Sequence, residues 1–212
     1  MIMTNDELLT TTRAVRKRLD LDRPVDLMTI ATCLRIAMQA PTGGSIERAR
    51  FIVIDDDGLK GQIAGLYRSA TMAAFENSLD RAGRESTKKA YEGAIELAGK
   101  LERVPVLVLF CMKGRLASSE PFQQAAYFGS IFPMIWSFQL ALRSRGLGSV
   151  ITTAHLRMEK DFAELLGIPF DDYGQVALVP VAYTRGLDFR PAQRKSLAEV
   201  GFLNGWGNRW TG

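Results

Sequence analysis

The sequence predicts a mixed fold in which helices surround a central sheet, of either the α/β or the α+β class. Four short runs of apolar and β-branched residues have the length and composition of buried strands, and stretches with helical periodicity separate them. The stretch from Tyr127 to Leu142 is apolar on almost every side, so we expect a central helix covered by other helices or by a second subunit. The four expected strands span residues 51–54, 105–111, 149–153 and 175–183.

Length and composition limit the architecture and the class of partner. The chain has 212 residues, so we expect a single domain over residues 1–212, with a helical excursion at about 59–103. Hydrophobic residues make up 47% and charged residues 24%, which allows a substantial core and excludes a disordered chain. The formal net charge of +4 is too small to indicate a nucleic-acid partner, and no basic stripe with interleaved aromatic residues is present.

Three features indicate a compartment. The central apolar stretch ends at Arg143 and Arg145 after roughly 16 residues, fewer than the roughly 20 needed to span a bilayer, so we expect no membrane contact. Cys33 and Cys111 lie in apolar patterns, which predicts buried thiols in a reducing environment. The first residues lack the basic region of a signal peptide. We therefore expect a cytoplasmic protein.

The N-terminal region combines a helix start with a cluster of cations. Residues 4–7 have the spacing of a capping box, so a first helix should begin there. If that helix persists, Arg13 and Arg16 lie on one side of it, three residues apart. The cations of residues 13–18 repel one another unless an anion lies among them. The cluster therefore indicates either a solvated basic patch or an anion-binding site.

The next elements follow from periodicity and turn residues. A second helix begins near Leu27 and ends at the turn-forming cluster of residues 40–45. After the first strand, residues 59–103 predict two helices with a polar bend near 79–85, which either pack on the core or cover a site. Their larger side chains look exposed, namely Tyr67, Met72, Phe75 and Tyr91.

The second half of the chain returns to the sheet. The central helix ends at Gly146-Leu147-Gly148, a C-terminal glycine signal, and leads into the strand at 149–153. A short amphipathic helix is expected at 159–166. The last strand contains Pro180, which predicts an edge position or a bulge. A basic tail and an extension with glycine and tryptophan over residues 202–210 follow.

Acid–base and metal chemistry are sparse in this sequence. The sole histidine, His155, has no acidic or cysteine neighbour at ligand spacing, so we expect a surface or helix-capping residue and no zinc site. No nucleophile elbow, P-loop or dinucleotide fingerprint is present. Such a chain is either a binding protein or an enzyme whose chemistry comes from a cofactor.

Four segments, in order and spread over essentially the whole chain, resemble the FMN-dependent nitroreductase family. They are Thr11–Arg18, Ala40–Gly44, Gly146–Thr153 and Arg194–Val200. The resemblance implies an α+β fold with a central, mostly antiparallel sheet flanked by helices, in an intertwined homodimer with FMN at the interface. It also implies a flavin oxidoreductase that takes hydride from NADPH or NADH and reduces a nitroaromatic, quinone or similar small-molecule acceptor.

The resemblance also implies roles for particular residues. Arg13 and Arg194, with Lys195 beside them, match phosphate-binding positions, where a guanidinium is the best partner. Arg16 matches the position at the flavin's pyrimidine edge, where a cation stabilises charge that develops on reduction. No side chain is implied as a catalytic group, and no metal is implied. The full cofactor-binding set, including a loop from the other protomer and the segment beside flavin N5, is Arg13, Ala14, Val15, Arg16, Pro41, Thr42, Gly43, Ser45, Ile151, Thr152, Thr153, Arg194 and Lys195.

The chain departs from the family pattern at two places. Family members commonly read N-x-Q-P-W or similar after the proline-glycine turn, whereas this chain has Ser45-Ile46-Glu47-Arg48-Ala49. The family's frequent Q-N pair in the central helix is Trp136-Ser137 here. Both changes bear on substrate preference and flavin affinity. Three alternatives therefore stay open: a non-catalytic FMN-storage protein, a flavin-degrading or dehalogenating family member, and a basic interaction module.

Overall fold

The computed structural model describes residues 3–116 and 120–211. Its centre is a five-stranded sheet in the order β1-β5-β3-β2, with β4 also paired to β5, and every pairing between these strands is antiparallel. This confirms the prediction of an α+β fold with a central antiparallel sheet. The strands are β1 (Leu19–Asp20), β2 (Ala49–Ile54), β3 (Val106–Lys113), β4 (Leu147–Ser149) and β5 (Tyr173–Thr184).

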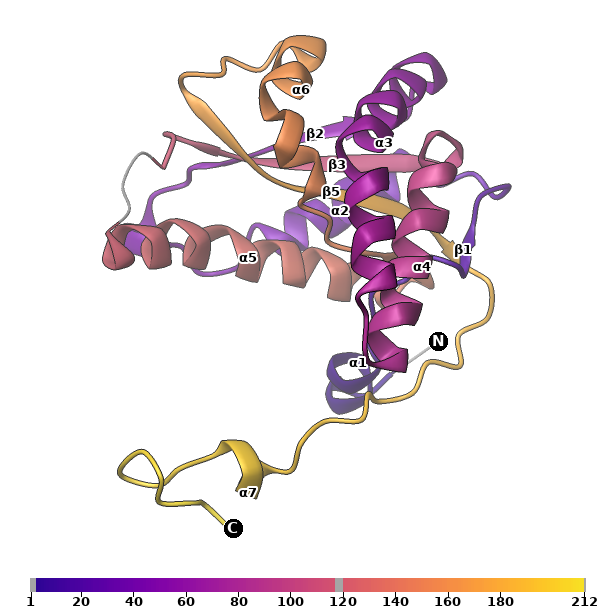
Figure 1. Cartoon of the computed structure of the whole chain (residues 1–212). Helices are drawn as coiled ribbons and strands as arrows, with labels where there is room; N and C mark the ends of the chain where they lie inside the picture. Colours follow the sequence, from indigo (N-terminus) through magenta and orange to yellow (C-terminus); the bar gives the residue numbers. More distant parts are fainter. Residues whose placement is uncertain (1–2, 117–119, 212) are drawn as a thin grey trace.

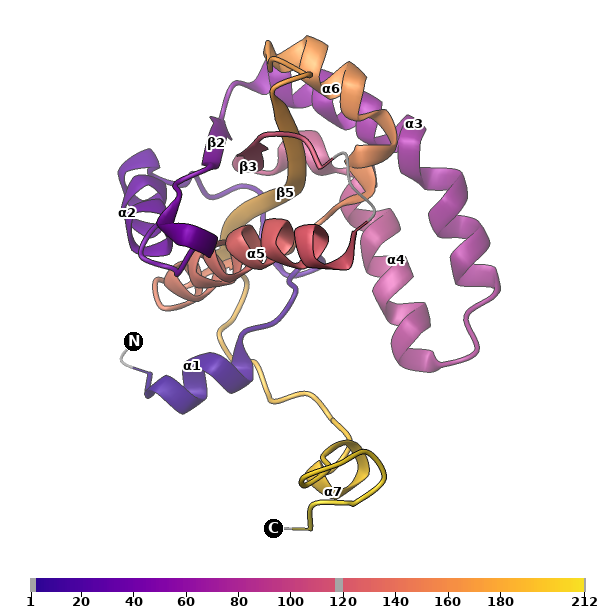
Figure 2. The ribbon, with the colours of Figure 1, turned by 90° about the vertical axis from the view of Figure 1, so that its left-hand side faces the viewer.

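Helices cover both faces of the sheet, because β3 is apolar on both sides (Figures 1 and 2). One face of β3, which includes Val108 and Phe110, packs on the helices α2 and α5. The other face, which includes Leu107 and Leu109, packs on α3, α4 and α6. The helix bounds are α1 (Asn5–Thr11), α2 (Leu27–Ala37), α3 (Asp57–Asp80), α4 (Glu85–Gly99), α5 (Pro121–Arg143), α6 (Glu159–Leu166) and α7 (Leu197–Val200).

The first helix begins where the sequence predicts and ends earlier than the cation cluster. Thr4 and Glu7 cap each other's backbone in a complete capping box. The helix stops at Thr11, so the condition under which Arg13 and Arg16 would share one side of it is not met. The physical reason is a competing partner: the Val15 amide donates to the Ser149 carbonyl at 2.9 Å, which draws this segment into extended pairing beside β4.

The central helix α5 is longer than predicted. It starts at Pro121, where proline is favoured, and runs for 23 residues instead of roughly 16. The predicted length is therefore wrong, and by length and composition alone this helix could cross a membrane, so its length gives no argument against one. Half of its most apolar window is buried inside the chain, however, where it packs on the sheet and on α2. Burial, and not length, is the observation that marks it as a core helix.

Pro180 lies neither at an edge nor in a bulge, which corrects the prediction. It is in the middle of β5, opposite Leu107 of β3, and the irregularity between β3 and β5 lies elsewhere, next to Phe110. On its other flank β5 pairs with β4 and, through an isolated bridge, with Thr152. Two residues lie between these pairings, and the shared register puts the first of them, Val150, opposite Pro180, which has no amide hydrogen to donate. The strand expected over 149–153 is therefore replaced by β4 and this single bridge.

The predicted excursion and tail are both present. The helices α3 and α4 form the excursion, with the bend at residues 81–84. At the other end, Arg18 fixes the base of the tail by donating to the Arg185 carbonyl at 2.9 Å and by pairing with Asp188. Beyond it the chain runs away from the sheet to α7 (Figure 1).

Candidate functional site

The segment that carries Arg13 and Arg16 is held against β4. Ala14 forms a parallel bridge with Ser149, and the neighbouring Gly148 has no side chain to obstruct it. A Cβ at Gly148 would lie 3.1 Å from the Cβ of Val15, which is closer than side chains ordinarily approach. Glycine at this position therefore lets the basic segment close on β4.

This contact places Arg16 beside the residues that follow β4. Together they line a cavity of about 200 Å³, which α3 and α4 also border. Four elements far apart in the sequence thus meet at one place, and Arg16 is brought together with three other residues predicted from the sequence. Ligand pockets generally measure about 300–1,000 Å³, so this cavity is smaller than a complete cofactor site. Its lining is Arg16, Tyr67, Phe75, Ala90, Tyr91, Ala94, Leu97, Ile151, Thr152, Thr153 and Ala154.

Arg16 carries an uncompensated charge in this cavity. Its side chain packs on α4, where a Cβ at Gly93 would lie 3.3 Å from the Arg16 Cδ. Burial lowers the pKa of Arg16, which means that the surroundings disfavour its charge. Within residues 3–116 and 120–211, no carboxylate pairs with it. A partly buried cation without a counter-charge suits an anionic ligand.

The backbone after β4 offers free donors. The Thr152 amide donates to the Leu178 carbonyl at 3.0 Å, and the Leu178 amide donates back to Thr152 at 2.9 Å. Successive amides of an extended segment point in opposite directions, so those of Ile151 and Thr153 face away from β5. Neither has a hydrogen-bond acceptor in the described part of the chain. Thr153, and not Thr152, therefore has the amide available to a ligand on the solvent side.

Three aromatic side chains at the site were not identified as site residues from the sequence. Tyr67 is 3% exposed, so its expected exposure is wrong; it interacts with Thr152, and burial raises the pKa of its hydroxyl. Phe75 of α3 and Tyr91 of α4 are partly buried against each other, with ring centroids 6.4 Å apart. The only sequence signal was their position on a long excursion between two strands, because helical spacing alone does not reveal which face meets Arg16.

The loop of Pro41–Ser45 lies in another part of the molecule. It forms the short 3-10 turn η1 (Gly43–Ser45), which the Ser130 hydroxyl fixes by accepting from the Gly43 amide at 3.0 Å. Figure 2 shows this turn beside α2 and α5, on the side away from α3 and α4. Pro41, Thr42 and Ser45 line a separate cavity of about 320 Å³. A single chain therefore does not bring this loop to Arg16.

The phosphate-binding positions are also apart within one chain. Arg13 donates to the carbonyl of Arg190 at 3.3 Å, so it touches the start of the tail. Arg194 and Lys195 are exposed and lie further along the tail, in the extended stretch before α7 (Figure 1). The structure thus gathers Arg16 and residues 151–153 at one cavity, with Arg13 nearby in sequence, and leaves the tail cations outside it.

His155 lies directly behind the site and is not the surface residue that the sequence predicts. It is fully buried, with its ring 5.4 Å from that of Phe162. Both ring nitrogens lack hydrogen-bond partners among the described residues, and burial lowers the pKa of His155 to about 3. It is therefore a neutral core residue. In the same part of the chain, no group of three His, Cys, Asp or Glu side chains could hold a metal ion.

Comparison with known proteins supplies the family. A sequence model described as "Nitroreductase family" matches residues 9–183. A curated relative, iodotyrosine deiodinase from Thermotoga neapolitana, is 27% identical over 117 residues, which are 55% of this chain and 57% of that protein. The chain thus spans little more than half the length of this relative.

Solved structures share the fold over nearly their whole length. One is oxidized iodotyrosine deiodinase bound to FMN and 3-iodo-L-tyrosine, with a TM-score of 0.67 and 22% identity over 90% of this chain and 94% of that chain. Another is a mutant of an FMN and NADPH-dependent nitroreductase from sphigopyxis sp. strain HMH. It has a TM-score of 0.69 and 19% identity over 96% of this chain and 100% of that chain.

Proposed function

The chain belongs to the nitroreductase family, and from this premise we propose that it is an FMN-dependent, NAD(P)H-oxidising enzyme that reduces a nitroaromatic, quinone or similar acceptor. We further propose that it works as a cytoplasmic homodimer with FMN at the subunit interface. The observation that carries the proposal is Arg16, a partly buried cation with no counter-charge among the described residues. It lines a cavity together with aromatic side chains and with residues 151 and 153, whose backbone amides are free.

The residues of this cavity fit an FMN ring. The ring is planar and aromatic, and it gains negative charge at its pyrimidine edge when reduced. Arg16 would stabilise that charge, and Phe75 with Tyr91 would border the ring and exclude water. The free amide of Thr153 would donate to flavin N5. Ala14 and Val15 would approach the cofactor with their backbone, because their segment leads into Arg16.

The remaining assigned residues require a second protomer or a movement of the tail. Arg13 and Arg194, with Lys195, would bind the phosphate, and Pro41, Thr42, Gly43 and Ser45 would come from the other subunit. Two observations support this arrangement: the cavity at Arg16 is smaller than a complete ligand pocket, and the Pro41–Ser45 loop lies on the opposite side of the same chain.

Bound FMN would supply the two-electron chemistry by accepting hydride from NADPH or NADH and passing it to the acceptor. The protein's part is to position both substrates against one face of the ring, so orientation provides most of the catalysis. Neither a nucleophile nor a metal is needed in such a site. Arg16 and the Thr153 amide would hold the ring, and α3 and α4, which border the cavity, would cover it.

Flavin content and reduction test the proposal directly. Purified protein should be yellow and contain about one FMN per chain by absorbance. Under anaerobic conditions NADPH or NADH should bleach the colour, and a nitroarene or quinone should restore it. Substitution Arg16→Gln should lower flavin retention. Colourless protein that does not take up added FMN in a calorimeter would refute cofactor binding, and bound FMN that neither nicotinamide reduces would favour a storage protein.

The shared site can be tested by mixing two deficient variants. Arg16→Gln and Arg194→Ala are each expected to lose FMN as homodimers. If Arg194 serves the site of its partner, a heterodimer of the two has one intact site and binds about half the normal FMN. If both arginines serve their own chain's site, every site in the heterodimer remains defective. Tagged co-expression followed by absorbance of the purified heterodimer distinguishes these arrangements.

Reductive dehalogenation is a second candidate, because an iodotyrosine deiodinase is found among both the sequence relatives and the structural neighbours. In that reaction a halogenated phenol takes two electrons and one proton, the carbon–halogen bond breaks, and halide leaves as the C–H bond forms. Reduced protein mixed anaerobically with a halophenol or a nitroarene would decide between the two. Halide release at a rate that exceeds nitroarene reduction would favour the dehalogenase.

A further inference from the structure

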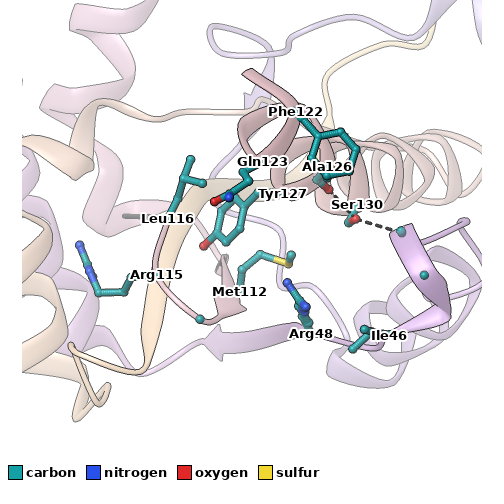
Figure 3. Close-up of a pocket in the computed structure, with 13 residues that line it drawn as sticks. Ile46, Arg48, Met112, Arg115, Leu116, Phe122, Gln123, Ala126, Tyr127 and Ser130 are labelled. Carbon is teal, nitrogen blue, oxygen red and sulfur yellow. Dashed lines mark hydrogen bonds between the residues drawn. The ribbon is translucent and has the colours of Figure 1, made fainter. Parts of the chain in front are cut away.

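A third cavity, larger than the two described above, lies at the opposite end of the central helix from its junction with β4. It measures about 970 Å³ and opens between η1, the end of β3 and the first turns of α5 (Figure 3). That volume falls within the range of about 300–1,000 Å³ typical of pockets that hold small molecules. None of the residues assigned to FMN lines it except Gly43.

The walls of this cavity are mainly apolar. Ile46 and Phe122 are exposed side chains that border it, and Met112 and Leu116 close it from the end of β3 (Figure 3). Phe122 is 77% exposed, which is unusual for a phenylalanine and leaves an aromatic face for a ligand ring. Such walls suit a planar apolar group rather than a polar chain.

The charge of the lining is positive. It includes Arg48 and Arg115 and contains no carboxylate among the described residues. Arg115 is already neutralised, because its guanidinium donates to both carboxylate oxygens of Glu159, at 3.1 and 2.6 Å. The Arg48 side chain has no hydrogen-bond or ion-pair partner in the part of the chain that the structure describes. Arg48 is therefore the cation that remains available to a ligand.

The backbone holds Arg48 at the rim. Its carbonyl accepts a hydrogen bond from the Lys113 amide at 2.8 Å, which ties the start of β2 to the end of β3. In Figure 3 the guanidinium points from this position toward Met112 and the interior of the cavity. The charge is thus carried on an anchored segment, which reduces the entropy lost when it binds an anion.

The hydroxyl of a largely buried tyrosine completes the set. Tyr127 is 9% exposed, and its hydroxyl lies where a Cβ at Gly174 would be only 2.6 Å away, so glycine makes room for it. This hydroxyl has no hydrogen-bond partner among the described residues, and Figure 3 shows it within the cavity. Burial and the nearby Glu159 raise the pKa of Tyr127 to about 12, so the group is neutral and can donate.

From this arrangement we infer that the cavity binds a small aromatic anion, such as an aromatic carboxylate or a phenolate. Arg48 takes the anionic group, the Tyr127 hydroxyl bonds a polar substituent, and the ring lies against Phe122 and Met112. Identification of this anion as the acceptor that the enzyme reduces rests on the proposed function, whereas the binding itself does not.

Calorimetry with three probes that share a nitrobenzene ring and differ in charge tests the inference on the protein as purified. The probes are 4-nitrobenzoate, nitrobenzene and protonated 4-nitrobenzylamine, which carry a negative, no and a positive charge. We expect 4-nitrobenzoate to bind most tightly and the amine least. Arg48→Gln should weaken 4-nitrobenzoate about 10-fold to 100-fold, the loss expected for one charge-assisted hydrogen bond, and should leave nitrobenzene nearly unchanged.

A neighbouring arginine provides the matched control. Arg50 is also exposed, but its guanidinium donates to the Ala49 carbonyl at 2.8 Å and lines a different cavity. Arg50→Gln changes the net charge by the same amount and should leave 4-nitrobenzoate affinity within about twofold of the original protein. Tyr127→Phe should weaken 4-nitrobenzoate severalfold while the melting temperature stays close to that of the original protein.

The outcomes separate this inference from the proposed function. Equal losses of 4-nitrobenzoate affinity in Arg48→Gln and Arg50→Gln would indicate a general effect of net charge and would refute the proposed binding site. So would 4-nitrobenzoate binding that survives Arg48→Gln, since the probe would then occupy another place, such as a flavin face. Colourless protein that still binds 4-nitrobenzoate through Arg48 would refute the proposed function and leave the cavity assignment standing.

Discussion

Alanine at Gly148 is predicted to disturb both the fold and the cofactor site. The added Cβ would lie 2.5 Å from the Thr184 Cγ2 and 3.1 Å from the Cβ and Cγ2 of Val15. Carbon atoms in contact ordinarily stay about 3.5–4.0 Å apart, so both neighbours must move. Val15 is hydrogen-bonded to Ser149, and its movement would shift the segment that presents Arg16.

The size of the effect follows from two opposing terms. Overpacking of a close-packed site costs about 1–3 kcal/mol. Alanine in place of glycine within a strand returns about 0.5–1 kcal/mol, because the unfolded chain loses less entropy. For a chain of this size each 1 kcal/mol corresponds to about 2–4 °C in melting temperature. Gly148→Ala should therefore melt a few degrees lower and retain less FMN.

Thermal melting and flavin absorbance of three variants, compared with the original protein, check this reasoning. Gly65→Ala is the control, because no heavy atom lies within 4 Å of its added Cβ, and the change should keep or raise the melting temperature. Adding Thr184→Ser to Gly148→Ala removes the closest carbon while keeping the hydroxyl that donates to Gly146, and should restore part of the loss. Gly148→Ala that melts and binds FMN like the original protein would refute the close-approach argument. Failure of Thr184→Ser to restore any stability would refute the assignment of the clash.

Three further predictions concern charge and burial. Arg194→Ala should weaken FMN retention more than Lys17→Ala. A phosphate contact is worth roughly 1.5–3 kcal/mol, whereas Lys17 already pairs with a glutamate on α4. Equal FMN retention in the two variants would contradict the assignment of Arg194 to the phosphate. Since the pKa of His155 is lowered to about 3 from an unfolded value near 6.5, the unfolded chain binds the extra proton, and stability should fall as pH drops below about 6.5. At pH 5 the loss from this residue is on the order of 2 kcal/mol, so His155→Leu should show a flatter dependence of melting temperature on pH between 7 and 5. Burial raises the pKa of Cys33, and that of Cys111 to about 12, so neither thiol should react with a disulfide reagent at pH 8 until the protein is denatured.

The elements that the sequence predicts well are those with local signals. Helix α1 begins at its capping box, α6 has the expected bounds and ends at Gly167 in the left-handed conformation, and the two helices of the excursion meet at the polar bend. Each signal comes from residues a few positions apart, so no tertiary contact was needed to interpret it. The two-residue strand β1 and the four-residue helix α7 are too short to show a period, and neither was predicted, although Ser196 and Glu199 form a capping box at the start of α7.

The errors arise where a distant partner decides the local structure. The cation cluster leaves the helix because Val15 pairs with Ser149, more than a hundred residues away. Pro180 has no amide hydrogen, and it remains inside the sheet because Val150, which lies opposite it just after β4, does not accept a hydrogen bond from it. Tyr67 becomes a site residue only because α3 lies over Thr152. Periodicity assigns a face to a helix or a strand, but it does not identify what that face will meet.

The single chain brings together only part of the FMN site that the sequence resemblance implies. In the proposed FMN site, Arg16 and the free amide of Thr153 would form one half, and the Pro41–Ser45 loop, on the other side of the chain, would form the second. No rotation of a side chain can join them, because the sheet and α5 lie between. In a second copy of the chain the loop could be presented from outside, next to the exposed Phe128 and Trp136 of α5, which are 40% and 39% accessible. A pair of chains packed along α5 would therefore cover these aromatic side chains and complete two sites at once, which is why loss of FMN and loss of the dimer should occur together.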